Sequence, residues 1–196
     1  PEFFGANMQC YTLSDFDRLA QVLSVVSVDE RTDAFCCLWL DKQDAISDEE
    51  MRQVHYEYPY QFAWQLRQKG VRRFFLLSKQ GAGKQHKDAI LAQKGQLEEA
   101  IANLQDGQGV GFELVASFQV GALLLSEKNE SFVSKLKQWG QYTWGWLAQA
   151  PLSPKQVAIA MTMTAYQAEY HQNTAQNRAN PLRQISHQQM LRLNGL

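Results

Sequence analysis

The chain has 196 residues, which suits one domain by the usual size of about 100–200 residues per domain. Apolar residues make up 45% of it and charged residues 20%, a composition that can build a core. The net charge of -1 excludes a general electrostatic attraction to nucleic acid or to an anionic membrane, and no apolar run reaches the ~20 residues of a membrane helix.

The first predicted element is a short strand at Met8–Thr12, and Ser14 after it can cap a helix. The run 34–40 is apolar without alternation and has the length of a strand. This pattern predicts a strand that is buried on both faces, as in parallel sheets covered by helices.

A long helical pattern begins after Ser47, whose hydroxyl can cap the first turn with Glu50 at the third position. It reaches Lys69 and stops at Gly70, a residue that favours the end of a helix. Pro59 lies inside the pattern. Because proline removes one backbone donor, we expect a kink or a restart there.

The second half of the chain continues to alternate between strand-like and helix-like segments. In order, they are a strand at 71–78, a helix at 87–104, a strand at 112–118, a helix at 131–148, a helix opening at Ser153-Pro154, a strand at 182–185 and a helix at 186–193. Such alternation is typical of crossover connections on a parallel sheet, so the predicted fold class is α/β. We treat 1–196 as one domain, with a sheet-forming core at 30–125 and a mainly helical part at 126–196.

The glycine-containing segment Gly81-Ala82-Gly83-Lys84 follows a predicted strand, as a phosphate-binding loop would. Its spacing does not fit, because no glycine lies five residues before Gly83 and Gln85 stands where serine or threonine would hold magnesium. The four histidines share no metal-ligand spacing with one another or with the cysteines, so we expect surface or hydrogen-bonded histidines and no metal.

Cys10, Cys36 and Cys37 form a poor disulfide framework, because the number is odd and two of them are adjacent. We therefore expect a reducing, cytoplasmic setting. The N-terminus shows no secretory signal. The chain begins at Pro1 rather than at methionine, as a fragment or a processed chain would.

Several linked segments follow one another from about residue 30: 33–38, 54–59, 70–82, Lys94-Gly95, 112–121 and the stretch near Ile185. In order and spacing they resemble the atypical short-chain dehydrogenases of the Tat-interacting-protein type. The resemblance implies a Rossmann-like domain in which NAD or NADP lies across the carboxyl ends of the parallel strands. It also makes dimerisation through a helix such as 47–69 plausible.

The resemblance also assigns residues to the chemistry of the site. Ser78 matches the serine that orients the carbonyl, and Lys94 matches the lysine that lowers the pKa of a catalytic tyrosine. Cofactor contacts would fall to Cys37, Leu38 and Trp39, together with Ser78 and Lys94. Without the resemblance, Ser78 is a strand-end hydroxyl and Lys94 a solvated helix lysine.

The chain departs from the family pattern at four places. Ile90 stands where the tyrosine should be, four residues before Lys94, and isoleucine cannot transfer a proton. Trp39 replaces a glycine that lets the cofactor approach the backbone, so its ring could fill the nucleotide cleft. The segment 119–121 reads Gln-Val-Gly in place of Arg-Pro-Gly, and the glycine-rich first strand-turn-helix unit is missing. Either an upstream segment supplies that unit or the sheet is rearranged.

Two interpretations of function follow. In the first, the protein is a redox-inactive member of the family that binds a small molecule or a protein partner, with or without NAD(P). In the alternative, it is an NAD(P)-dependent oxidoreductase that acts on a small carbonyl or hydroxyl substrate. The sequence predicts neither the substrate nor the identity of the partner.

Overall fold

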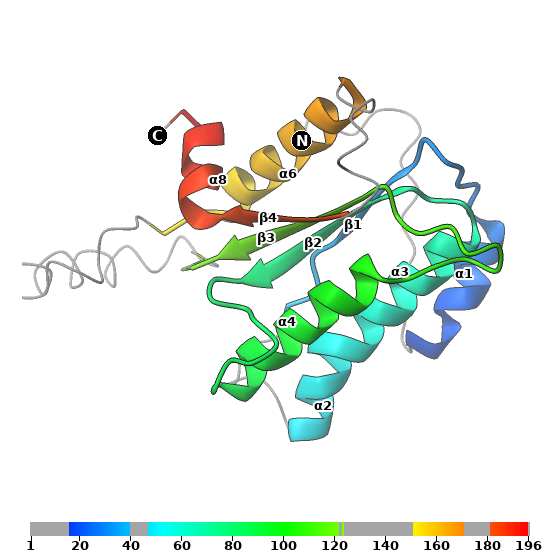
Figure 1. The fold of residues 1–196 in the computed structure, drawn as a ribbon, viewed down its shortest axis with the longest axis horizontal. Coiled ribbons are helices and arrows are strands. Elements are labelled where there is room, and N and C mark those ends of the chain that lie inside the picture. The colour runs from blue at the N-terminus through cyan, green and yellow to red at the C-terminus, as the bar shows by residue number, and fades with distance from the viewer. Residues whose placement is uncertain (1–15, 40–46, 122, 124–150, 171–180, 196) are drawn as a thin grey trace, which may run out of the picture.

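Four parallel strands form one sheet in the computed structural model, in the order β1-β2-β3-β4 (Figure 1). They are β1 (Asp33–Cys36), β2 (Arg73–Lys79), β3 (Leu114–Val120) and β4 (Leu182–Ser186). The structure describes residues 16–39, 47–121, 123, 151–170 and 181–195. The predicted α/β class with a parallel sheet is therefore confirmed, and the C-terminal part of the chain contributes β4 to that sheet.

Helices cover both faces of the sheet. On one side lie α1 (Leu19–Val25), α3 (Tyr58–Gln68) and α4 (Ala89–Ala102), and on the other lie α6 (Pro154–Tyr170) and α8 (His187–Leu193), as Figure 1 shows. A short 3-10 turn, Phe16–Arg18, precedes α1, and α2 (Asp48–Arg52) leads toward α3. The result is a three-layer arrangement with a core on each side of the sheet.

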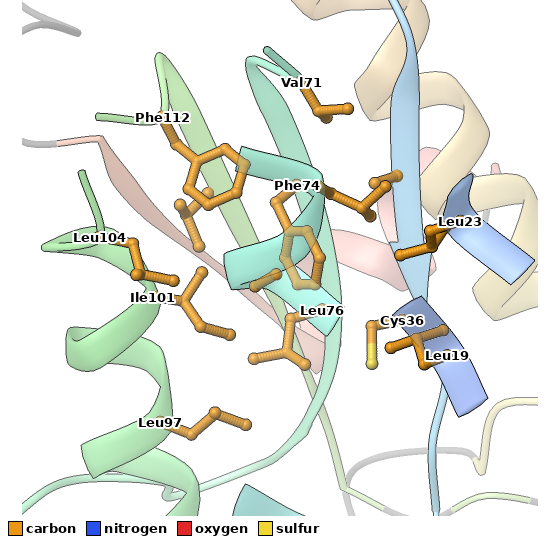
Figure 2. Close-up of a cluster of buried hydrophobic side chains, with 14 residues drawn as sticks. Leu19, Leu23, Cys36, Val71, Phe74, Leu76, Leu97, Ile101, Leu104 and Phe112 are labelled. Atoms are coloured by element: carbon orange, nitrogen blue, oxygen red, sulfur yellow. The ribbon is translucent and has the colours of Figure 1, made fainter. Parts of the chain in front are cut away.

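The core is divided between these two faces because side chains alternate along each strand. Phe74 and Leu76 of β2 point toward α1, α3 and α4, where they meet Leu97 of α4 in the cluster of Figure 2. Phe75 and Leu77 point the other way, into the cluster beneath α6. Strand β2 is thus buried on both faces, as expected for an inner parallel strand.

Strand β1 differs from its prediction. The apolar run 34–40 predicts a strand buried on both faces, but the strand is only Asp33–Cys36 and its burial alternates. Ala34 and Cys36 are buried, whereas Phe35 stays 40% exposed and stacks on Phe75 at 4.8 Å between ring centroids. The prediction was wrong because β1 is the last strand at one edge of the described sheet.

The long helical pattern 47–69 is divided as Pro59 predicts. The Ser47 hydroxyl accepts a hydrogen bond from the Glu50 backbone N–H and caps α2. A π-helical turn, Gln53–Glu57, follows, and α3 then begins with Pro59 as its second residue, where the missing N–H is least costly. Gly70 ends the segment with a φ of +91°, which glycine adopts without strain.

The helix predicted to open at Ser153-Pro154, the strand at 182–185 and the final helix are also confirmed. Ser153 caps α6, because its hydroxyl accepts a hydrogen bond from the Gln156 N–H while the Gln156 side chain accepts one from the Ser153 N–H. Ser186 and Gln189 form the same reciprocal cap at α8. The predicted strand Met8–Thr12, the Ser14 cap and the helix 131–148 lie outside the described residues. None of the helices in the described ranges has both the length and the apolarity to cross a membrane.

Candidate functional site

Polar side chains gather near the carboxyl ends of the strands. Trp39 follows β1, Ser78 lies near the end of β2, and Gln119 is its register partner near the end of β3. Helix α4 crosses this region and buries Lys94 and Glu98, which stand one turn apart. In open α/β sheets, ligands bind beyond the carboxyl ends of the strands, so this is the candidate site.

Glu98 is the centre of a buried hydrogen-bond network. Its Oε1 accepts hydrogen bonds from the hydroxyls of Ser78 at 2.6 Å and Ser117 at 2.7 Å. Its Oε2 accepts one from the Gln184 amide at 2.8 Å, and the Gln119 amide lies 3.4 Å from both oxygens. The carboxylate is therefore satisfied by neutral donors, and it joins α4 to three neighbouring strands.

Lys94 lies one turn before Glu98 and is completely buried. Within the described residues, its Nζ has no hydrogen-bond partner. The ammonium lies 5.9 Å from the centre of the Trp39 ring. Burial lowers the pKa of Lys94 to about 8, although nearby Cys36 and Glu98 act in the opposite direction. The amine consequently spends part of its time uncharged near neutral pH.

Trp39 also contacts His55, which the π-helical turn directs inward. The two rings meet edge to face, with centroids 6.4 Å apart, and His55 is buried. The Trp39 indole thus has both Lys94 and His55 as neighbours. Trp39 itself is only partly buried. Burial raises the pKa of Cys36 to about 11, so this neighbouring thiol is neutral at physiological pH.

The structure brings together some of the predicted site residues and separates others. Ser78, Lys94 and Trp39 lie around α4 at the carboxyl ends of the strands, but the expectation of a solvated Lys94 is wrong. Cys37 is exposed, and its Sγ lies 3.9 Å from the Met161 sulfur on α6. Leu38 is partly buried against the core on the opposite side, beneath α1, α3 and α4. The predicted cofactor contacts therefore do not form one surface.

Ile90 occupies the first turn of α4 and is partly buried. The hydroxyl of Ser78, at the position expected to orient a carbonyl, donates instead to Glu98. Gln119, the first residue of the altered 119–121 segment, also faces that carboxylate. Gln119 thus belongs to a network within the protein, and Lys94 Nζ has no hydrogen-bond partner among the described residues.

Sequence reasoning missed Glu98, Ser117, Gln184 and His55. A signal for Glu98 was available, because it follows Lys94 by four residues and shares the buried helix face with Ile101. A charged residue on that face requires partners in the sheet. The prediction of surface or hydrogen-bonded histidines holds for His187, which is buried and accepts a hydrogen bond from Gly121, whereas His55 is not on the surface.

The loop 81–84 packs on α4. The Gly83 N–H donates to the Leu91 carbonyl at 3.1 Å, and Gly95 lets the helix approach the loop closely. The glycines therefore have a packing role that does not depend on phosphate. Across the described ranges, no three or more histidine, cysteine, aspartate or glutamate side chains are grouped to hold a metal ion.

No family model matches the chain, and no curated protein shows a significant match to it. The function of the protein is therefore inferred from the side chains of the candidate site.

Proposed function

We propose that this protein is a redox-inactive relative of the short-chain dehydrogenases that acts by binding a small molecule or a protein partner. The observation that carries the proposal is the engagement of Ser78 by Glu98. A serine that orients a substrate carbonyl needs a free hydroxyl, but this hydroxyl donates to a buried carboxylate at 2.6 Å.

Two neighbouring positions support the same conclusion. Ile90 provides no proton, so Lys94 has no phenol whose pKa it could lower. Trp39 lies against the Lys94 ammonium, where the family lysine would hold a ribose. A ring at this place competes with a dinucleotide for the same space.

The alternative, an NAD(P)-dependent oxidoreductase, has one observation in its favour. Ser78 and Lys94 both lie at the carboxyl ends of the strands, where a dinucleotide would be placed in such a fold. This alternative requires a proton donor other than residue 90 and a displacement of Trp39.

Calorimetry and thermal shift with NADH and NADPH distinguish the two functions. They should be carried out on the protein with any residues that precede Pro1, since a pyrophosphate-binding turn would lie there. We expect no heat of binding and no change in melting temperature with either cofactor. Micromolar binding of either one would contradict the proposal and favour the oxidoreductase.

A further inference from the structure

The amine of Lys94 is buried, and no described residue accepts a hydrogen bond from it. Buried polar groups in native proteins nearly always have hydrogen-bond partners, so an orphaned amine points to a role beyond packing. The carboxylate nearest in the chain, that of Glu98, forms no ion pair with it, because its oxygens are occupied by Ser78, Ser117 and Gln184.

Burial around Lys94 favours an uncharged amine, and Lys79 on β2 repels a positive charge. Cys36 on β1 and the Glu98 carboxylate on α4 act in the opposite direction, although the raised pKa of Cys36 keeps its thiol neutral. His55, on the π-helical turn, lies on the other side of Trp39. An uncharged lysine in an apolar environment is a nucleophile toward carbonyl carbon.

We propose that Lys94 forms an imine with a small aldehyde or ketone that enters beside Trp39. The Nζ lone pair attacks the carbonyl carbon and gives a carbinolamine. The carbon–oxygen bond then breaks and a carbon–nitrogen double bond forms, while both amine hydrogens leave with the oxygen as water. The step needs neither an oxidant nor a reductant.

Trp39 determines access to the amine. Trp39 is partly exposed and its ring centre lies 5.9 Å from Nζ, so we infer that a small molecule reaches the amine by displacing this side chain. Because the amine is completely buried, we expect only a small carbonyl compound to reach it. The proposal is independent of dinucleotide binding, since it uses the amine alone.

Reductive trapping tests the inference on the native chain. The protein is treated with propionaldehyde and cyanoborohydride at pH 7, and the alkylated lysines are quantified by peptide mass spectrometry at short times. With a pKa of about 8 instead of 10.5, Lys94 has roughly 300-fold more neutral amine than an ordinary lysine at this pH. Burial slows the entry of the aldehyde and so reduces this advantage. We still expect Lys94 to be labelled at least about tenfold faster than the exposed Lys87 and Lys155.

The comparison is made within one folded protein, so its result does not depend on the stability of a variant. Labelling of Lys94 at or below the rate of Lys87 and Lys155 would overturn the proposal. The Lys94→Arg variant confirms the assignment of the modified peptide, because guanidinium does not form the imine. A result against the imine leaves the cofactor-binding experiment unaffected, so the two proposals fail separately.

Discussion

Gly95 on α4 faces the peptide between Gly83 and Lys84 so closely that a Cβ at residue 95 would lie 2.3 Å from the Gly83 carbonyl carbon. The hydrogen bond from Gly83 to the Leu91 carbonyl forms across the same contact. This contact holds the loop after β2 against the helix that carries Lys94. The glycine beside the candidate lysine therefore positions the site.

We expect Gly95→Ala to destabilise the fold by about 1–3 kcal/mol, because backbone must move to admit the methyl group. Urea unfolding followed by circular dichroism measures the change. Gly83→Ala is the matched control, since a Cβ there has its nearest contact at 3.9 Å. Equal unfolding midpoints for Gly95→Ala and the unmodified protein would show that the close approach does not exist.

Glu98→Gln provides a test of the buried network. The new side-chain amide at residue 98 would direct its N–H hydrogens at groups that themselves donate hydrogen bonds in the native protein, the Ser78 hydroxyl and the Gln184 amide. We therefore expect the free energy of unfolding to fall by about 1–3 kcal/mol. The adjacent Glu99→Gln is the control, because Glu99 is exposed and pairs only with the exposed Lys84, and its effect should stay within about 0.5 kcal/mol. Similar losses for the two variants would refute the role of the network.

Much of the fold could be predicted because local signals agreed with the tertiary structure. The cap at Ser47, the interruption at Pro59 and the reciprocal cap at Ser153 each act within a few residues. The exposure of Phe35 could not be predicted in this way. It depends on the position of β1 at an edge of the described sheet, which is a property of strand order and not of the run itself.

The contacts within the candidate site could not be predicted. Ser78 and Lys94 were identified from a resemblance, but the partner of Ser78 is Glu98, twenty residues later on α4. That pairing depends on the register of a helix over three strands. Gln184 reaches the same carboxylate from the far end of the chain, and no local pattern indicates such a contact.

Lys94→Met tests the burial of the amine through pH. Below about pH 8 the folded and unfolded chains both hold the Lys94 proton, so the cost of burying the charge is fully present. Above this pH the folded protein releases a proton that the unfolded chain keeps up to about 10.5, and stability therefore rises. Between pH 7 and pH 9, we expect the free energy of unfolding of the unmodified protein to rise by about 1 kcal/mol relative to that of Lys94→Met.

Urea titrations of both proteins at these two pH values measure this difference. Cys36 does not interfere, because both proteins contain it and the destabilisation that its raised pKa causes at alkaline pH cancels in their difference. An unchanged difference in free energy of unfolding between pH 7 and pH 9 would mean that Lys94 keeps an ordinary pKa. The amine would then be solvated, contrary to the structure.

Asp106 gives a second pH dependence, in the acid range. The Arg67 guanidinium donates to Asp106 at 2.9 Å, and this bond, with the backbone N–H groups of Val110 and Gln108, lowers the pKa of Asp106 to about 2. Its stabilising effect is present above about pH 4 and is lost as the pH falls toward 2. We expect Asp106→Asn to lower the free energy of unfolding at pH 7. We also expect this variant to lose less stability than the unmodified protein when the pH is lowered from 4 to 2.

Acid titrations followed by tryptophan fluorescence test this linkage, with Glu113→Gln as the control. Glu113 pairs with Arg72 at the surface, where an ion pair contributes little. The Asp106→Asn titration should be flatter than that of the control between pH 4 and pH 2. Parallel curves would exclude Asp106 as a source of acid sensitivity.

Ile90→Tyr places a phenol four residues before Lys94, at the position of the tyrosine in the family that the sequence resembles, and thereby tests the proposed lack of redox function. With Trp39 against the lysine, we expect this variant to leave NADPH unoxidised in the presence of small aldehydes, measured by absorbance. The double variant Ile90→Tyr, Trp39→Gly removes the ring as well, yet Ser78 still donates to Glu98, so we expect it to remain inactive. Reduction of an aldehyde by the single variant would show that a cofactor site was intact and that only the proton donor was lacking. Reduction by the double variant alone would identify Trp39 as the obstacle to the cofactor, because the two proteins differ only in that ring.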